Sequence, residues 1–248
     1  MSKLYLIGAG PGAADLLTLR AARVLAEQAD VVLADDLVSA DVLALVRPQA
    51  RVMRVGKRGG RPSTPQDFIH RLMLRYARRG CCVVRLKGGD PYVFGRGREE
   101  VDTLTSAGID VEVVPGLTAG LAVPAAAGIA VTHRGHAHGV TLVTGTPGDG
   151  CSEPDWQALA RSGTTLVVYM GLSRLLQIAA RLIVGGLPAS TPAAAIASGS
   201  LPEQRQIVAT LGELPERVRD AGLSSPAIIV VGEAAAHAAQ RRALALAA

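Results

Sequence analysis

Short apolar segments, each about the length of one β-strand, alternate with helical patterns along nearly the whole chain. This alternation constrains the fold strongly, because it is typical of βαβ units and of parallel sheets covered by helices. We therefore predict an α/β protein with largely parallel sheets. In the first half of the chain, strands are expected at residues 4–8, 31–34, 51–55, 82–86 and 111–114.

The pattern changes at Pro115-Gly116, which marks the expected boundary between two αβα domains, residues 1–116 and 117–248. Beyond it, an alanine-rich segment precedes a second series of strands. These strands are expected at residues 140–144, 164–169, 192–197, 206–210 and 228–231. Helices are expected at residues 16–27, 66–79, 97–107, 118–127, 155–160, 173–184 and 214–220. Because the junction is short, we expect the two domains to share a ligand cleft.

Composition excludes several classes of protein. The chain has 248 residues, of which 49% are hydrophobic and only 3% aromatic, so its core must be aliphatic. The net charge of +5 comes from dispersed arginines without interleaved aromatic residues, which argues against a nucleic-acid partner. Apolar runs of membrane-spanning length and a signal-peptide pattern are absent, so no membrane partner is expected. Cys81, Cys82 and Cys151 have the spacing of neither a disulfide framework nor a metal site, and we expect a cytoplasmic protein.

The most informative segment is residues 85–100, RLKGGDPYVFGRGREE, which follows a buried-looking apolar run. Gly88 and Gly89 let the backbone approach a ligand closely. Asp90-Pro91 fixes a turn and places an acceptor at the end of the expected strand. Ligands of open α/β sheets bind at the carboxyl ends of the strands, so the segment predicts a binding site.

A second glycine-rich loop supports a competing interpretation. Residues 8–13, GAGPGA, lie between an expected strand and an expected helix and match the dinucleotide-binding fingerprint. Asp35 ends the next strand, where a ribose-binding acid belongs. Pro11 weakens this interpretation because it removes one amide donor from the loop. A flavin- or nicotinamide-dependent oxidoreductase therefore stays open as an alternative on local grounds.

Several segments together resemble the uroporphyrinogen-III C-methyltransferases of the tetrapyrrole methylase superfamily. The resemblance extends from about Lys3 to Glu233. It is carried by residues 85–100 and by the shorter segments 8–12, 16–19, 55–58, 115–119, 132–134, 168–171 and 225–227. It implies the tetrapyrrole methylase fold, in which two αβα domains enclose a cleft for cofactor and substrate, and it suggests a homodimer.

The implied reaction is S-adenosyl-L-methionine-dependent methylation of uroporphyrinogen III at C2 and C7. The products are precorrin-2, an intermediate of sirohaem and cobalamin biosynthesis, and S-adenosyl-L-homocysteine. No metal is required. A sister methylase of a later precorrin intermediate is the nearest alternative. A protein that binds S-adenosylmethionine without turning over a tetrapyrrole is a further one.

The resemblance also assigns roles to individual residues. It implies that Asp35 is the proton acceptor and Lys57 the proton donor, both in the first domain with the substrate, while the second domain completes the cofactor site. The implied contacts to S-adenosylmethionine are Pro11, Gly88, Gly89, Asp90, Val93, Thr118, Ala119, Met170 and Gly199. Arginine binds carboxylates in a bidentate fork, so the candidates for the anionic substrate are Arg58, Arg96, His133 and Arg134.

Three points stay open from the residues alone. Asp35 could instead cap a helix that begins near Leu37, and Lys57 could belong to a solvated basic loop. Asp35-Asp36 is a carboxylate pair where the family usually has a single acid, so either residue could be the base. His136 and His138 resemble a metal pair, but they have no third ligand in view and no metal site is expected there.

Overall fold

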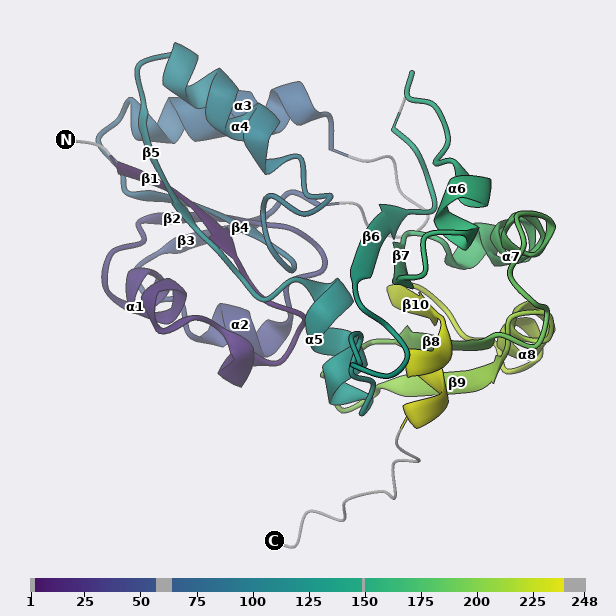
Figure 1. Cartoon of the computed structure of the whole chain (residues 1–248). Helices are drawn as coiled ribbons and strands as arrows, with labels where there is room; N and C mark the ends of the chain where they lie inside the picture. The colour runs from purple at the N-terminus through teal and green to yellow at the C-terminus, as the bar shows by residue number, and fades with distance from the viewer. Residues whose placement is uncertain (1–2, 57–63, 149, 239–248) are drawn as a thin grey trace, which may run out of the picture. The chain divides into compact units, whose positions relative to one another are not determined.

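The protein is described by a computed structural model that covers residues 3–56, 64–148 and 150–238 (Figure 1). The chain divides into two compact units, Met1–Ala119 and Gly120–Ala248. Each unit has its own five-stranded sheet. All ten strands that the sequence predicts are present, with ends within one or two residues of those expected.

The sheet of the first unit is entirely parallel and has the order β3-β2-β4-β1-β5. Its strands are β1 (Lys3–Gly8), β2 (Val31–Ala34), β3 (Arg51–Arg54), β4 (Val83–Lys87) and β5 (Asp110–Val114). Every residue of β2 and β4 is buried, which explains why these strands have nearly continuous apolar runs. Arg85 and Lys87 break this pattern, because both are charged and both lie in the buried central strand.

Helices cover both faces of this sheet (Figure 1). They are the short 3-10 helix η1 (Ala14–Leu16) and the helices α1 (Leu19–Glu27), α2 (Ala40–Ala44), α3 (Gln66–Ala77) and α4 (Gly97–Ser106). α1 and α2 pack on one face through Val24, Leu25 and Val42. α3 and α4 pack on the other through Met73 and Leu104.

This arrangement creates a topological switch point between β1 and β4. The two strands are neighbours in the sheet, but the chain leaves β1 toward α1 on one face and leaves β4 toward α4 on the other. In open α/β sheets the crevice for ligands forms at such a point, beyond the carboxyl ends of the strands. Both glycine-rich loops of the sequence lie there.

The sheet of the second unit is mixed, with the order β6-β7-β10-β8-β9. Its strands are β6 (Val140–Thr144), β7 (Thr165–Tyr169), β8 (Pro192–Ala197), β9 (Arg205–Thr210) and β10 (Ala227–Val231). Only β6 and β7 are parallel, so the prediction of largely parallel sheets is wrong for this unit. Residues 198–204, which connect β8 to β9, are too few for a parallel crossover and therefore impose antiparallel pairing.

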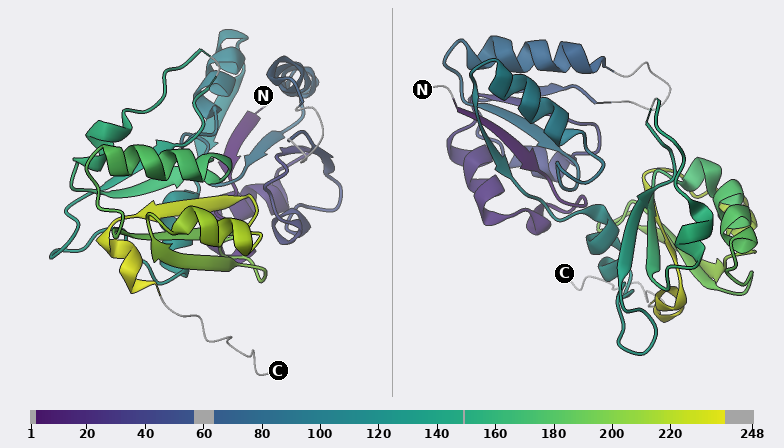
Figure 2. Two further views of the ribbon diagram at one scale, coloured as in Figure 1. Left: turned by 90° about the vertical axis from the view of Figure 1, so that its right-hand side faces the viewer. Right: turned by 45° about the horizontal axis from the view of Figure 1, so that its top comes forward.

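The helices of the second unit are α5 (Ala119–Ala126), α6 (Trp156–Ala160), α7 (Leu175–Val184) and α8 (Leu214–Asp220), with the 3-10 helices η2 (Leu172–Arg174) and η3 (Glu233–His237). α6, α7 and α8 cover one face of the sheet through Trp156, Leu182 and Leu214, and α7 lies beside α8 (Figure 2, left). The opposite face, with Val167 and Val230, is also buried, and η3 packs there against β8. Among the helices that the structure describes, none has both the length and the apolar character needed to cross a bilayer.

Candidate active site

The two glycine-rich loops of the first unit are hydrogen-bonded to each other. Gly89 donates its amide to the Gly10 carbonyl at 2.7 Å, and Gly10 donates to the Gly89 carbonyl at 3.2 Å. Ala9 donates to the Lys87 carbonyl at 2.7 Å. The loop after β1 and the loop after β4 therefore form one continuous edge at the switch point.

Three glycines allow the backbones at this edge to come unusually close. A Cβ on Gly116 would lie 2.3 Å from the Gly89 carbonyl oxygen, and a Cβ on Gly8 would lie 2.5 Å from the Gly116 amide nitrogen. Asp90 secures the same contact, because its Oδ2 accepts from the Gly116 amide at 3.1 Å while its Oδ1 accepts from the Tyr92 amide at 2.8 Å. In the structure Asp90 thus holds the loop after β4 against the loop after β5.

The dinucleotide-binding alternative does not fit this geometry. The Ala9 and Gly10 amides, which would face a pyrophosphate, are already bonded to backbone carbonyls, and Pro11 has no amide hydrogen. The next α-helix begins only at Leu19, with Thr18 as its N-cap, so no helix N-terminus follows the third glycine directly. The expected helix at residues 16–27 begins as the separate 3-10 turn η1. The local fingerprint is therefore misleading.

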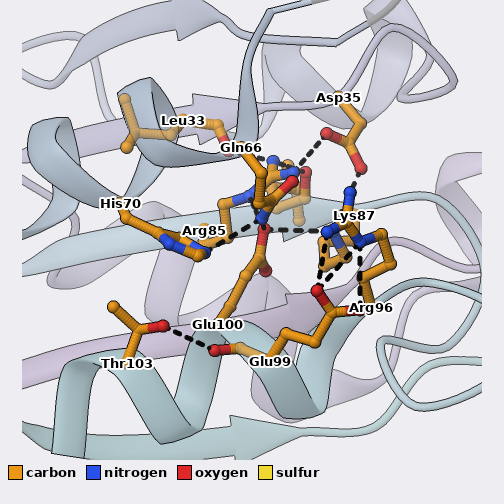
Figure 3. A network of polar contacts seen from close by, with 11 residues as sticks. Leu33, Asp35, Gln66, His70, Arg85, Lys87, Arg96, Glu99, Glu100 and Thr103 are labelled. Carbon is orange, nitrogen blue, oxygen red and sulfur yellow. Dashed lines mark hydrogen bonds and ion pairs between the residues drawn. The ribbon is translucent and has the colours of Figure 1, made fainter. Parts of the chain in front are cut away.

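Asp35 directly follows β2 and is the outer carboxylate of a charged network (Figure 3). Arg85 Nη2 donates to Asp35 Oδ1 at 2.5 Å, and Lys87 Nζ lies 3.6 Å from Asp35 Oδ2. The Asp35 side chain is 24% exposed, whereas those of Arg85 and Lys87 are 2% and 6% exposed. Asp35 thus presents a carboxylate to solvent while both of its oxygens face buried cations.

Glu100, in the first turns of α4, completes the network from the buried side. Its Oε1 accepts from Arg85 Nε at 3.0 Å, Lys87 Nζ at 3.4 Å and Gln66 Nε2 at 2.9 Å. Glu100 is 0% exposed. Two cations and two carboxylates therefore balance each other in the interior, as buried charges require.

Burial shapes the acid–base properties of the two cations. Burial, together with the charge of the neighbouring Arg85, lowers the pKa of Lys87. Burial alone would also lower the pKa of Arg85, but the charges of Asp35 and Glu100 outweigh it and raise that pKa. Arg85 is consequently a fixed cation, whereas Lys87 releases its proton more readily than an exposed lysine does. Asp35 is the half-buried carboxylate of the network that solvent reaches, so it is the one that can accept a proton from a bound molecule.

Asp35 does not cap the helix that follows it. The helix that follows begins at Ala40 and is capped by Ser39, whose Oγ accepts from the Val42 amide at 3.2 Å. The interpretation of Asp35 as a helix cap is therefore wrong. Asp36 lies against the end of β3, where a Cβ on Gly56 would be 2.3 Å from the Asp36 amide nitrogen. Lys57 and Arg58 lie outside the described residues.

Most of the predicted cofactor contacts of the first unit lie at the edge formed by the two glycine-rich loops. Gly89 adopts φ +68°, and a Cβ there would lie 3.7 Å from the Ala119 amide nitrogen and 4.0 Å from Thr118 Cα. A Cβ on Gly88 would lie 2.9 Å from Leu37 Cβ, so this loop also borders the segment that follows Asp35. The Val93 amide donates to the Asp90 carbonyl at 3.2 Å. These residues therefore lie close together beyond the carboxyl ends of the parallel strands.

The predicted substrate residue Arg96 has an unusual backbone conformation and an acidic neighbour. It adopts φ +59° at the N-cap of α4, and its guanidinium binds Glu99, with Nη2 2.6 Å from Oε2 (Figure 3). The Arg96 side chain is 57% exposed. A ligand carboxylate at Arg96 would therefore compete with Glu99.

In the second unit, the predicted cofactor residues Met170 and Gly199 follow the ends of β7 and β8. Met170 adopts φ +52°, is 52% exposed, and has its carbonyl bound by Thr146 Oγ1 at 2.9 Å. A Cβ on Gly199 would lie 2.4 Å from Val123 Cγ1 of α5, so packing already requires glycine there. Left-handed backbone is unfavourable for non-glycine residues, so the surrounding structure must hold Met170 in this conformation.

The predicted substrate residues His133 and Arg134 lie in an exposed loop of the second unit. The His133 ring stacks on His136 at a centroid distance of 4.8 Å and lies 5.8 Å from His237. His136 is thus grouped with these two rings rather than with His138. Within residues 3–56, 64–148 and 150–238, His, Cys, Asp and Glu form no group of three or more suited to a metal ion.

Sequence reasoning missed the buried members of the network, Arg85, Lys87 and Glu100. A signal for the first two was present, because both interrupt an otherwise apolar central strand. Glu100 gave none, since an acidic residue in the first turns of an exposed-looking helix is ordinary.

Comparison with known proteins places this geometry in context. The sequence profile of the tetrapyrrole (corrin/porphyrin) methylases matches residues 3–215. The uroporphyrinogen-III C-methyltransferase of Pseudomonas aeruginosa is 57% identical over 234 residues, which are 93% of each chain. A sirohaem synthase of Methylococcus capsulatus is 51% identical over 92% of this chain, which spans only 48% of that longer protein.

Two solved structures share the fold along nearly the whole chain. A uroporphyrin-III C-methyltransferase from Thermus thermophilus, complexed with S-adenosylhomocysteine, superposes with a TM-score of 0.80 at 44% identity, covering 94% of this chain and 92% of the other. A cobalt precorrin-4 methyltransferase of cobalamin biosynthesis superposes with a TM-score of 0.84 at 30% identity, covering 94% and 96%.

Proposed function

The chain belongs to the tetrapyrrole (corrin/porphyrin) methylase family, and we propose from this premise that it methylates uroporphyrinogen III at C2 and C7. The methyl donor is S-adenosylmethionine, and the products are precorrin-2 and S-adenosylhomocysteine. The observation that carries this proposal is the 57% identity, over 93% of both chains, to a uroporphyrinogen-III C-methyltransferase. The sheet edge with Asp35 provides a fitting site for the chemistry.

The residues at this edge fit S-adenosylmethionine. A Cβ on Gly89 would lie in ordinary contact with Ala119 and Thr118, at 3.7 and 4.0 Å, so the loop after β4 lies directly against these two predicted cofactor residues. Backbone groups of Gly88 and Gly89, with Pro11, Val93, Thr118 and Ala119, would hold the cofactor, and Asp90 would fix the loop that carries them. We assign Met170 and Gly199 of the second unit to the same cofactor, with the exposed Met170 thioether offering a polarizable contact.

The reaction requires positioning and the removal of a proton. When bound, S-adenosylmethionine supplies an electrophilic methyl group on its sulfonium. Asp35 accepts the proton that the substrate carbon loses after methylation, since its carboxylate is the solvent-facing member of the network. Arg85 keeps that carboxylate oriented through its contact at 2.5 Å. We assign proton donation to Lys57, which lies outside the described residues.

The substrate carries several carboxylates, which calls for arginine and histidine at the entrance to the site. We assign this role to Arg58, Arg96, His133 and Arg134. Arg96 is the best placed of the described residues, because its exposed guanidinium already forms a bidentate pair with the carboxylate of Glu99. A substrate carboxylate replaces Glu99 at this arginine.

A later precorrin intermediate is the second candidate substrate, favoured by the superposition on the cobalt precorrin-4 methyltransferase. That structure shares 30% of its sequence with this chain, against 57% for the uroporphyrinogen-III enzyme of Pseudomonas aeruginosa, so the first candidate is preferred. By family analogy we further propose a homodimer. The three free cysteines agree with a reducing cytoplasmic location.

An anaerobic assay separates the candidates. Purified protein is incubated with S-adenosylmethionine and enzymatically generated uroporphyrinogen III, and the products are measured by mass spectrometry. Addition of two methyl groups, with a matching amount of S-adenosylhomocysteine, is the expected result. If S-adenosylhomocysteine binds but no methyl group is transferred, the substrate must be a later intermediate or an unrelated acceptor.

A further inference from the structure

Glu100 is a buried carboxylate that the proposed chemistry does not use directly. It is 0% exposed, so it cannot touch a substrate at the sheet edge in this structure. Its Oε1 accepts three hydrogen bonds, yet its Oε2 is buried and accepts none from the described residues. A buried and incompletely satisfied carboxylate is unfavourable for folding, which calls for an explanation beyond stability.

The explanation lies in the partners that Glu100 shares with Asp35. Arg85 and Lys87 are two positions apart on β4, so both side chains leave the same face of the strand. Arg85 bridges Glu100 Oε1 at 3.0 Å and Asp35 Oδ1 at 2.5 Å. Lys87 bridges Glu100 Oε1 at 3.4 Å and Asp35 Oδ2 at 3.6 Å. Each cation therefore lies between an inner and an outer carboxylate (Figure 3).

We propose that Glu100 is a positioning residue, which sets the strength of Asp35 as a base by sharing Arg85 and Lys87 with it. While Glu100 is charged, it neutralises part of the positive potential that both cations exert on Asp35. Without this charge, both cations act on Asp35 alone and hold its carboxylate in the ionised form more strongly. This inference rests on the proposed function, because Asp35 is its base.

The inference predicts opposite effects for changes on the two sides of the network. Glu100→Gln keeps the shape and one acceptor oxygen but removes the negative charge. This variant is expected to move the acidic limb of the plot of kcat against pH to lower pH, by on the order of one pH unit. Because Asp35 then becomes a weaker base, kcat at neutral pH is expected to fall about tenfold. Lys87→Met removes one cation and is expected to move the same limb to higher pH. Lys87→Arg keeps the charge and restores the wild-type profile.

Other charged groups near the network could also shift the pH profile of kcat, so their contribution must be distinguished from that of Glu100. His70 Nε2 lies 3.2 Å from Gln66 Nε2, and Gln66 is a partner of Glu100, so His70→Asn tests whether the observed limb belongs to this histidine. Asp102→Asn removes one carboxylate from the exposed side of the same helix, where it binds Arg98 at 2.8 Å, and serves as the matched control. Among the described residues, the charged and titratable groups of the network and of the segments next to it are Asp36, Arg54 on β3, Arg85 and Lys87 on β4, His70 on α3, and Arg96, Glu99 and Glu100 at the start of α4 (Figure 3).

The experiment measures kcat and KM for S-adenosylmethionine from pH 5 to 9 in the wild type and in each variant, with S-adenosylhomocysteine binding as the test of folding. Opposite shifts for Glu100→Gln and Lys87→Met, an unchanged KM and a neutral Asp102→Asn are the results expected. Limbs that stay in place, or that move in the same direction in both variants, would overturn the inference and leave Glu100 a purely structural role. A wild type that does not methylate uroporphyrinogen III refutes the proposed function instead, before any variant is compared.

Discussion

The close approach of three backbones at the sheet edge makes Gly116→Ala a demanding test of the structure. The added Cβ would lie 2.3 Å from the Gly89 carbonyl oxygen and 2.8 Å from two backbone atoms of Gly8. An ordinary contact begins at 3.4 Å, so the loop must move by about 1 Å. None of these neighbours is a flexible side chain, so we expect the upper end of the range for overpacking, about 3 kcal/mol.

For a unit of this size, such a loss lowers Tm by roughly 10 °C. Displacing the segment that carries Gly88 and Gly89 by about 1 Å is also expected to lower turnover roughly a hundredfold. Thermal unfolding and the methylation assay measure the two effects. Gly148→Ala is the control, because among the described residues beyond its chain neighbours its Cβ would meet only Cys151 Sγ within 4 Å, at 3.8 Å. If Gly116→Ala is as stable and active as this control, the three backbones do not approach each other as described.

Three further substitutions test other parts of the structure. Thr18→Ala removes the Oγ1 that accepts from the Ala21 amide at the start of α1, and we expect a loss of about 1 kcal/mol in urea unfolding, while no change would argue against this cap. Tyr169→Phe removes the hydroxyl that accepts from the buried Gly120 amide at 2.5 Å, which is expected to destabilise the second unit by about 1–3 kcal/mol; full stability would show that the amide has another acceptor. Burial lowers the pKa of Lys87 below the usual 10.5, so the unfolded chain binds more protons than the folded one as the pH rises toward that value. The free energy of unfolding of the wild type is therefore expected to increase with pH relative to Lys87→Met, and a constant difference would mean that the Lys87 pKa is not lowered.

The sequence predicts individual elements better than their pairing. All ten strands were identified. The signal is clearest for β2 and β4, which are buried along their whole length, whereas the edge strands β3 and β9 were identified although they contain no buried residue. The direction of the strands in the second sheet was predicted wrongly, since neither β8 nor β10 carries a local signal for its partner. The short helix α2 was missed because five residues are too few to show a helical period.

In the candidate site too, single residues could be predicted from the sequence but their contacts could not. Asp35 could be selected from its place at a strand end and from the family resemblance. Its contacts with Arg85 and Lys87 could not be predicted, because they depend on β2 and β4 being neighbours although β3 and α3 separate them in the chain. The register that pairs Leu33 with Arg85 and Ala34 with Leu86 brings the end of β2 beside Lys87. Glu100 joins this group only through the packing of α4 on the sheet.

The role of Asp35 is tested most directly by Asp35→Asn, which keeps the shape of the side chain and removes its ability to accept a proton as a carboxylate. Wild type and variant are compared for uroporphyrinogen III turnover and for S-adenosylhomocysteine affinity. We predict that turnover falls by roughly a hundredfold to ten-thousandfold, the usual contribution of a general base, while the affinity changes little. Equal turnover in the two proteins would contradict the assignment of Asp35 and point to Asp36 or to water as the proton acceptor.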